Sequence, residues 1–553
     1  MEAIGRVFSR PQAKPYRTRK LSKSIEVHLD ERGLLKFSPN DVENPKNWST
    51  ARRIYITAAC IVTIMNGSMA SSSPSGCLPS ISEKLHVSQE VAKLTVTLFV
   101  VGFASGPALW APLSEYFGRR GIMLGTFICY FSFTFLCAFT PNIGGLLVGR
   151  FLCGTFISGA LSNTPGVFVD IWGPIERNLC MALFTIALDV GPAVGPITSG
   201  FYQLKLDWRW SFYQLLWVSG FTLFILPTVP ETLQSRCLLH KARRLRKIPG
   251  YEHVKAPIEV EGKTLPQIFK IALLRPWRIV FDPIAGLTAI YITVVYTLLY
   301  MLFTIFPIAF IEIRGWNAGV GELPLLSVVV GALISGVYVY ALSFRERKKI
   351  QNGHKFTPED SLPVGMVGAI CFPIGMFMLA WGGMYAHVHW IVPSIGGVFV
   401  SIAITLLFIA FLNYLSESYL MYAASAQAGN QIIRSAIAAS APLFSSQMFS
   451  KMTLGGGGSM IGGISVLLAP IPFIFYRYGA KIRQKSKFAP TPEAEEKEEK
   501  EVEKDAQGAR EDEEPEEKTE EVESPGLDDE SVHSETRFND SDEIEKGEKR
   551  HDL

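Results

Sequence analysis

The sequence predicts an all-α polytopic membrane protein with 12 transmembrane helices arranged as two six-helix halves. Hydrophobic residues make up 48% of the 553-residue chain and charged residues only 19%, a balance that is unusual for a soluble globular protein. The apolar residues gather in runs of about 20, the length that a helix needs to cross a bilayer. A long basic segment separates six of these runs from the other six.

The apolar runs define five regions of the chain. The expected regions are an N-terminal arm (1–53), a first six-helix bundle (54–230), a central cytoplasmic loop (231–282), a second six-helix bundle (283–488) and a tail (489–553). The predicted spans begin near Ile54, Val91, Ile122, Leu146, Leu179 and Phe212, and then near Pro283, Leu323, Pro363, Ile391, Gly429 and Ser459.

Basic residues predict the topology. Cations cluster in every second loop, with only scattered cations in the loops between them, and such clusters mark the cytoplasmic side of a membrane protein. Both termini are therefore expected in the cytoplasm, with the plasma membrane as the predicted location and a vacuolar or vesicle membrane as the alternative. The cytoplasmic clusters are Arg119 with Arg120, Arg177, Lys241 to Lys247, Arg345 to Lys349, and Arg477 to Arg483.

The tail has the opposite charge. Residues 489–553 contain 27 acidic and 9 basic residues, so residues 1–488 hold the remaining 24 acidic and 44 basic ones. A chain segment with so much charge and so few apolar residues is expected to be disordered. The basic body could also suggest nucleic acid as a partner, but its cations flank apolar runs, which favours membrane topology.

Other classes of protein lack support in the sequence. The eight cysteines are scattered without a CxxC pair, which argues against a disulfide framework or a zinc site. No metal cluster, phosphate-binding loop, catalytic triad or dinucleotide fingerprint is found, and the arm before the first span contains no cleavable signal peptide. We expect no enzymatic activity, no metal, no cofactor and no nucleic-acid partner.

Between the second and third spans the sequence reads Ala111-Pro-Leu-Ser-Glu-Tyr-Phe-Gly-Arg-Arg120. This loop resembles the signature G-x-L-a-D-R-x-G-R-R of the major facilitator superfamily. Gly118, Arg119 and Arg120 match, and Glu115 stands where the family usually has Asp. Glycine permits a tight turn, and Glu115 is expected to pair with the arginines or with a helix terminus. The resemblance implies that these four residues form a conformational gate.

Two further segments match the same family. In the fourth span, Leu146-Leu-Val-Gly-Arg150-Phe-Leu-Cys-Gly154 resembles its second motif, which has an arginine within the membrane. Arg150 is expected to face the bundle interior because a buried charge is costly; the alternative is that it snorkels outward. In the fifth span, Gly191, Pro192, Gly195 and Pro196 resemble the antiporter motif. Paired Gly and Pro permit close helix contacts and a kink.

Shorter segments narrow the resemblance to the fungal twelve-span drug:H+ antiporters. They include Asn44-Pro-Lys-Asn-Trp48, Trp208-Arg-Trp210, Pro230-Glu-Thr232 and Arg434-Ser435. The resemblance implies a monomeric, proton-coupled antiporter that lies in the lipid bilayer and exports small hydrophobic or amphipathic compounds, such as drugs, fungicides, toxins or secondary metabolites, across the membrane. A polyamine exporter and a nutrient uniporter or importer are alternatives, as is a membrane sensor.

Polar and aromatic residues within the spans form a candidate substrate cavity. Tyrosine rings in the seventh span can stack on planar ligands, although they can equally serve to pack that span against its neighbours. The candidate cavity residues are Asn66, Asn163, Tyr291, Tyr296, Tyr300 and Asn430.

Asp189 is the predicted proton-coupling residue. It lies about ten residues, or roughly 15 Å, into the fifth span and so near the bilayer midplane. Burial disfavours the charged carboxylate and brings its protonation within reach of a physiological gradient, and Arg150 is the expected counter-charge. The alternative is that Asp189 satisfies backbone groups freed at the Gly/Pro kink. Other charged residues, Glu115, Asp170, Glu417 and Arg434, are expected near cytoplasmic ends, and Glu312 and Glu322 near the outer side.

Overall fold

The protein is described from a computed structural model. It describes residues 28–30, 33–38, 41–260, 265–352, 357–419, 422–484, 486 and 488, and all structural statements below concern these residues. The first part of the predicted N-terminal arm and the acidic tail 489–553 lie outside the described residues. The elements that are described are helices, apart from two isolated bridges that join Leu29 with Leu35 and Leu34 with Lys255.

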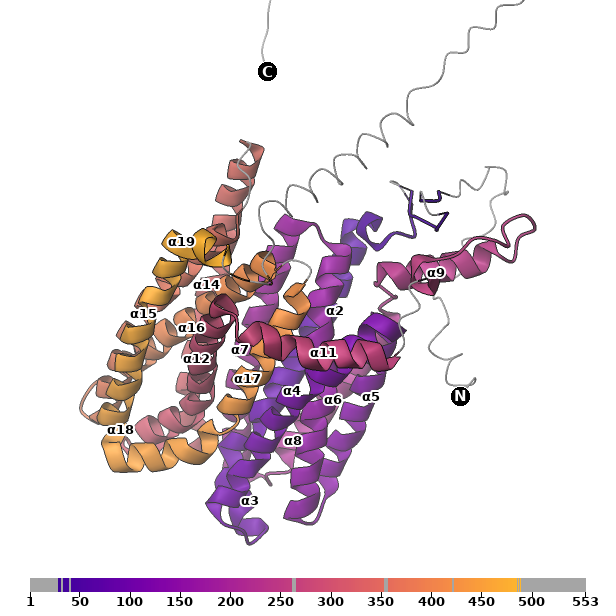
Figure 1. The fold of residues 1–553 in the computed structure, drawn as a ribbon. Coiled ribbons are helices and arrows are strands. Elements are labelled where there is room, and N and C mark those ends of the chain that lie inside the picture. Colours follow the sequence, from indigo (N-terminus) through magenta and orange to yellow (C-terminus); the bar gives the residue numbers. More distant parts are fainter. Residues whose placement is uncertain are drawn as a thin grey trace, which may run out of the picture. The chain divides into compact units, whose positions relative to one another are not determined.

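The first half of the chain contains the helices of the first predicted bundle (Figure 1). They are η1 (Pro45–Asn47), α2 (Thr50–Ser72), η2 (Ser73–Cys77), α3 (Leu78–Lys84), α4 (Gln89–Phe117), α5 (Arg119–Phe139), α6 (Ile143–Ile171), α7 (Pro174–Lys205), α8 (Trp210–Ile225) and η3 (Leu226–Thr228). Ser49, Ser88 and Asn142 cap the starts of α2, α4 and α6 with their side-chain oxygens, which satisfies backbone N–H groups that a helix leaves free at its start.

The second half repeats this pattern. Its helices are α12 (Pro283–Pro307), η4 (Ile308–Glu312), α13 (Ala318–Glu322), η5 (Leu323–Leu325), α14 (Leu326–Gln351), η6 (Pro358–Ser361), α15 (Leu362–Met384), α16 (Ile391–Tyr419), α17 (Ala423–Ala438), α18 (Ala441–Leu468) and α19 (Pro470–Arg483). At Thr453 the backbone leaves helical geometry, with φ 61° and ψ 167°, so α18 is bent there.

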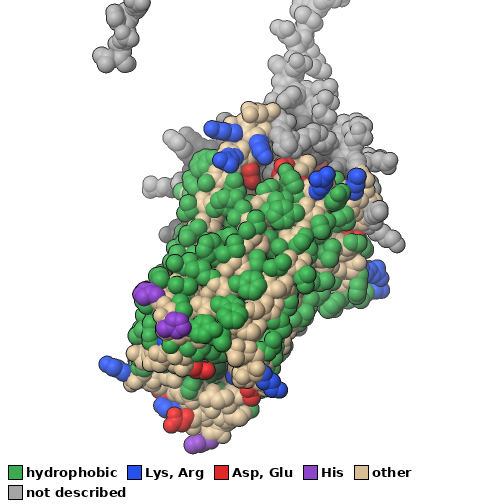
Figure 2. All heavy atoms as spheres, turned by 90° about the vertical axis from the view of Figure 1, so that its left-hand side faces the viewer, with side chains coloured by type: hydrophobic (Ala, Val, Ile, Leu, Met, Phe, Trp, Pro, Cys, Tyr) green, Lys and Arg blue, Asp and Glu red, His purple; other side chains and the backbone are tan. Residues whose placement is uncertain are grey.

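Within the described part of the chain, 11 helical segments are long and apolar enough to cross a membrane. Helix α17 lies where the sequence predicts the eleventh span and has only 16 residues, or about 24 Å of helix. Together with α17, the apolar segments make the predicted 12 spans. Figure 2 shows hydrophobic side chains over the middle of one face of the molecule, with charged side chains toward its two ends, as expected for a surface that faces lipid.

Each half has its own hydrophobic core. Buried residues of α2 to α8 form one cluster, and buried residues of α12 to α19 form most of another, which also includes Val96, Val100 and Ala193 of the first half where the halves meet. Close backbone contacts hold the helices of a half together. A Cβ atom at Gly154 of α6 would lie 2.0 Å from the carbonyl oxygen of Phe99 on α4, so this crossing requires glycine at position 154.

The two halves meet mainly through helices α7 and α4 of the first half. Helix α7 of the first half packs against α13, α14 and α16, while α17 of the second half packs against α4. Any residue on the facing sides of these helices changes its surroundings if the halves move apart. The fold therefore places α7 and α17 where a transport site would be expected.

The segment predicted as a central loop contains three helices: α9 (Gln234–Leu245), α10 (Pro257–Val260) and α11 (Leu265–Val280). Helix α9 is amphipathic, and its buried residues Leu238, Ala242 and Leu245 recur at helical spacing. They pack with Leu35 of the arm, and Lys241 forms an ion pair with Asp41. Burial of this apolar face explains why a segment rich in Arg and Lys folds as a helix.

Candidate functional site

Asp189 lies at the contact between the two halves. It belongs to α7, and its side chain is only 2% exposed. The Thr405 hydroxyl of α16 donates a hydrogen bond of 2.7 Å to the Asp189 carboxylate. The guanidinium of Arg434 on α17 acts on this carboxylate electrostatically. An acid of the first half thus accepts a hydrogen bond from one residue of the second half and interacts electrostatically with another.

The position of Arg434 corrects the expectation that it lies near the cytoplasmic end of its span. Helix α17 begins at Ala423, earlier than the sequence suggested, so Arg434 lies 11 residues into it, or about 16 Å along the axis. The side chain is 4% exposed. Its guanidinium lies 5.0 Å from the ring centroid of Tyr296 and 4.8 Å from that of Phe408.

The tyrosines of α12 continue this polar region. Tyr296 and Tyr300 are in edge-to-face contact with ring centroids 5.3 Å apart, and their hydroxyl oxygens are 3.5 Å apart. The Tyr300 hydroxyl also interacts with the Ser71 hydroxyl of α2, across the contact between the halves. A set of buried polar and aromatic residues therefore lies between the halves. We call this set the central cluster: Asp189, Tyr296, Tyr300, Thr405, Asn430 and Arg434. Asn430 is included because it is buried and lies four residues before Arg434, on the same face of α17.

Arg150 faces the interior, as its motif predicts, but it is not the partner of Asp189. Its Nε, Nη1 and Nη2 atoms donate to the carbonyl oxygens of Thr95, Ala70 and Ser71 at 2.7, 2.8 and 2.9 Å. Among the described residues, the two are not in contact. The connection between them is indirect, through Ser71, which accepts from Arg150 and contacts Tyr300. Three carbonyl acceptors indicate that Arg150 fixes α2 and α4 in place.

The predicted cavity residues separate into two groups. Tyr296, Tyr300 and Asn430 belong to the central cluster. Asn66 instead accepts a hydrogen bond of 2.8 Å from the Tyr130 hydroxyl and donates to Ser219, within the first half.

Tyr291 and Asn163 are also buried. The Tyr291 ring packs at 5.3 Å from that of Phe411. Both polar atoms of the Asn163 amide lack hydrogen-bond partners among the described residues. The structure thus buries every residue of the predicted cavity and brings half of the set together between the halves.

The antiporter-like motif packs α7 closely against α2. A Cβ atom at Gly195 would lie 2.9 Å from the carbonyl oxygen of Met69. Pro196 has no N–H to donate to the Pro192 carbonyl one turn earlier, and the Ser72 hydroxyl donates to that carbonyl instead, at 2.7 Å. This replacement compensates the carbonyl that Pro196 leaves without a donor, and α7 continues as one helix through this position.

The gate motif has partners that the sequence analysis missed. The Glu231 carboxylate accepts hydrogen bonds from the backbone N–H groups of Arg119 at 2.9 Å and Arg120 at 3.2 Å. Asp170 lies 3.6 Å from the Arg119 side chain. Glu115, the predicted partner, is exposed and contacts neither arginine in the described structure. Glu231 is the acceptor instead, because Gly118, with φ 101°, turns the start of α5 toward the end of the first bundle.

Two other features lie near the contact between the halves. Glu322, predicted near the outer side, is 3% exposed, and its Oε2 atom lacks a hydrogen-bond partner among the described residues.

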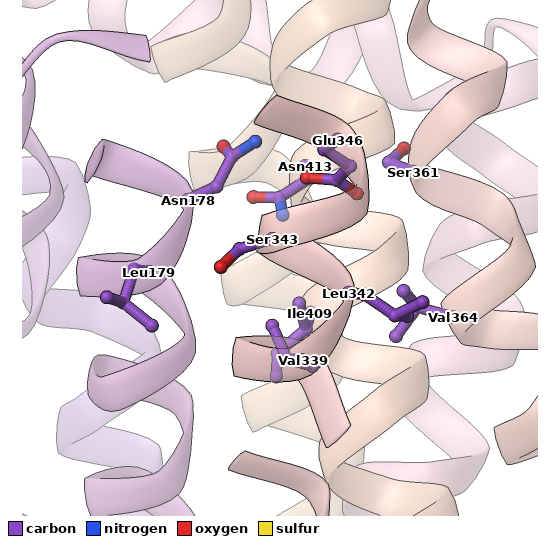
Figure 3. Close-up of a pocket in the computed structure, with 10 residues that line it drawn as sticks. All are labelled: Asn178, Leu179, Val339, Leu342, Ser343, Glu346, Ser361, Val364, Ile409 and Asn413. Atoms are coloured by element: carbon purple, nitrogen blue, oxygen red, sulfur yellow. The ribbon is translucent and has the colours of Figure 1, made fainter. Parts of the chain in front are cut away.

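A cavity of about 30 Å³ is lined by residues of α7, α14, η6, α15 and α16. In Figure 3, Asn178 of α7 and Asn413 of α16 lie on facing sides of it. This volume suits about one water molecule, so the helices around the cavity are closed against an organic compound.

Comparisons with known proteins place this geometry in context. The sequence model of the Major Facilitator Superfamily matches residues 59–442. The efflux pump FUBT of Fusarium oxysporum is 36% identical over 473 residues, which cover 82% of this chain and 77% of the pump. The multidrug transporter FLU1 of Candida albicans is 36% identical over 457 residues, which cover 82% and 75%.

Solved structures agree at the level of the fold. The proton:xylose symporter XylE aligns with a TM-score of 0.57 and 17% identity, and the alignment covers 78% of this chain and 96% of XylE. At this identity the likeness concerns the arrangement of helices alone.

Proposed function

Because the chain belongs to the major facilitator superfamily, we propose that it is a proton-coupled antiporter that exports small hydrophobic or amphipathic organic compounds. The observation that supports the coupling is the buried Asp189 carboxylate of one half, which accepts a hydrogen bond from Thr405 of the other half and is acted on electrostatically by Arg434 of that half. The efflux pump and the multidrug transporter to which the chain is similar support the direction and the type of substrate.

The proposed cycle follows from the chemistry of a buried acid and base. While Asp189 is ionised, its charge compensates that of Arg434, and the closed central cluster is electrically balanced. When Asp189 takes up a proton, Arg434 remains as a buried charge without compensation, which is costly in a low dielectric. The closed arrangement is then disfavoured, and the halves part to hydrate the arginine. A proton gradient across the membrane can in this way drive exchange between the two open states.

The location of the protein is part of the same proposal. We place it in the plasma membrane with both termini in the cytoplasm, because the basic clusters lie in alternate loops and such clusters stay on the cytoplasmic side. Drugs, fungicides, toxins and secondary metabolites are the proposed substrates. A polyamine is less suitable, because its cationic groups would meet the buried guanidinium of Arg434.

The test uses the full-length protein in sealed proteoliposomes with an imposed pH gradient. Uptake of tritiated cycloheximide, fluconazole and xanthone is compared for the wild type and Asp189→Asn. The variant keeps hydrogen-bonding groups at position 189 but cannot titrate, so it should lose accumulation against a gradient and retain exchange down a gradient. Glu90→Gln is the matched control, since Glu90 is an exposed acid that pairs with Lys93 at 2.9 Å.

Two results would contradict the proposal. If the wild type shows no pH-driven flux of any of the three compounds, the proposal of proton-coupled export is wrong. If Asp189→Asn accumulates the compounds fully, Asp189 is not the coupling residue. Glu322→Gln would then test the other buried acid near the contact between the halves.

A further inference from the structure

The structure contains two buried arginines in its membrane spans that differ in their bonding. Arg150 uses three guanidinium nitrogens to bind carbonyl oxygens. The Nε atom of Arg434 is buried without a hydrogen-bond partner among the described residues. The guanidinium group lies over the rings of Tyr296 and Phe408. Asp189 acts on Arg434 through space, without an ion-pair contact in the described structure. Arg434 therefore has donor capacity that the fold does not use.

Neighbouring residues on α17 share this property. The buried side chains of Asn430 and Ser435 are 1% exposed, and neither has a partner for its polar side-chain atoms among the described residues. Asn430 and Arg434 are four residues apart and so lie on the same face of the helix. Burying a donor without a partner is unfavourable, and such groups in a folded protein call for an explanation, of which an absent ligand is one.

We propose that Asn430 and Arg434 form a subsite that donates hydrogen bonds to a carbonyl oxygen of a neutral, planar organic substrate. The inference rests on the proposed export function and specifies the substrate class of the same site. Tyr296 and Phe408 contribute the flat apolar surfaces on which an aromatic skeleton stacks.

Charge decides between a neutral and an ionised substrate group. An organic cation is repelled by Arg434, which has only donors and stays protonated. An organic anion has to compete with the Asp189 carboxylate, whose charge acts on the same guanidinium, and two anions close together in a low dielectric repel each other. A carbonyl oxygen accepts from Asn430 and Arg434 without changing the charge balance. The subsite is thus suited to aromatic ketones, lactones and similar oxygenated neutral compounds.

The test measures binding to the full-length protein in lipid nanodiscs at pH 7.5. Tritiated xanthone, which has a ring carbonyl, is displaced by xanthene, which has a CH2 group in its place, or by xanthone-2-carboxylate. One hydrogen bond from a charged donor corresponds to about a tenfold change in affinity. Xanthone should therefore bind the wild type at least about tenfold more tightly than xanthene, and more tightly than the carboxylate.

Asn430→Leu is the decisive variant. It replaces an amide without partners by an apolar side chain of similar size, a change that is close to neutral or stabilising when the amide has no structural role. We expect an unchanged or higher melting temperature and a smaller preference for xanthone over xanthene, because the variant loses the neutral donor of Asn430 and keeps the charged donor of Arg434. Asn66→Leu is the matched control, because the Asn66 amide is bonded to Tyr130 and Ser219. It should lower the melting temperature and leave the preference intact.

Arg434→Lys provides a second measurement if Asn430→Leu proves unstable, because lysine keeps the charge but not the planar set of donors. It should also reduce the preference for xanthone. An equal affinity of the wild type for xanthone and xanthene, tighter binding of the carboxylate, or full preference in both variants would overturn the subsite. Proton-driven flux without any carbonyl preference would overturn this inference alone. Carbonyl preference without proton-driven flux would overturn the proposed coupling alone.

Discussion

Replacing Glu231 by glutamine should loosen the start of α5. The Oε1 atom of Glu231 accepts from the backbone N–H groups of Arg119, Thr232 and Leu233 at 2.9, 3.1 and 3.0 Å, and Oε2 accepts from that of Arg120 at 3.2 Å. Glutamine keeps the first acceptor and places an amide N–H group where the second one was. It also removes a negative charge from the N-terminus of a helix.

The magnitude follows from these contacts. A hydrogen bond to a charged group contributes about 1.5–3 kcal/mol, and an anion at a helix N-terminus adds about 0.3–1 kcal/mol. Because Glu231 is only half-buried, we expect a loss near the lower end, about 2–3 kcal/mol. A change of this size corresponds to an opening equilibrium about 30- to 140-fold larger.

Hydrogen exchange measures this opening directly. The backbone amides of Arg119 and Arg120 should exchange about 30- to 140-fold faster in Glu231→Gln than in the wild type. Glu115→Gln is the matched control from the same loop. Since Glu115 is exposed and contacts neither arginine in the described structure, its loss should change stability by less than about 0.5 kcal/mol. Equal exchange in the two variants would refute the assignment of Glu231 as the partner of the gate motif.

Three further predictions concern the side of the protein that we propose faces the cytoplasm. Gly118→Ala should lower the melting temperature, because position 118 has φ 101° and a Cβ atom there would lie 2.4 Å from Oε2 of Glu231; an unchanged melting temperature would contradict the described turn. Burial, together with Arg243 and Arg236, lowers the pKa of His240 below its ordinary value of 6.5. The unfolded segment therefore binds the proton first, and α9 should become more sensitive to protease as the pH falls below 6.5, but less so in His240→Gln. Truncation after Phe488 should preserve transport per inserted molecule, since the removed residues contain few apolar side chains.

The sequence predicts the spans well because each span is a local pattern. A run of apolar residues has to form a helix in a bilayer, whatever its neighbours do. Helix α17 shows the limit of this approach. Its first residues, around Ser425 and Gln427, are polar, so hydropathy places the start near Gly429, whereas the helix begins at Ala423. That shift of six residues moves Arg434 from the expected cytoplasmic end to the centre of the molecule.

Partners are harder to predict than depth, because they depend on how distant helices meet. The sequence identifies Asp189 as a deep acid and Arg150 as a buried base, and it offers no means of deciding whether they touch. In the structure, the carbonyl oxygens of Thr95, Ala70 and Ser71 bind Arg150. Asp189 points instead toward α16, where Thr405 donates to it. Of the two arginines, only Arg434 lies on a helix of the other half, so only its interaction with Asp189 changes when the halves move apart. This difference is the physical reason for assigning the coupling role to Arg434 and a structural role to Arg150.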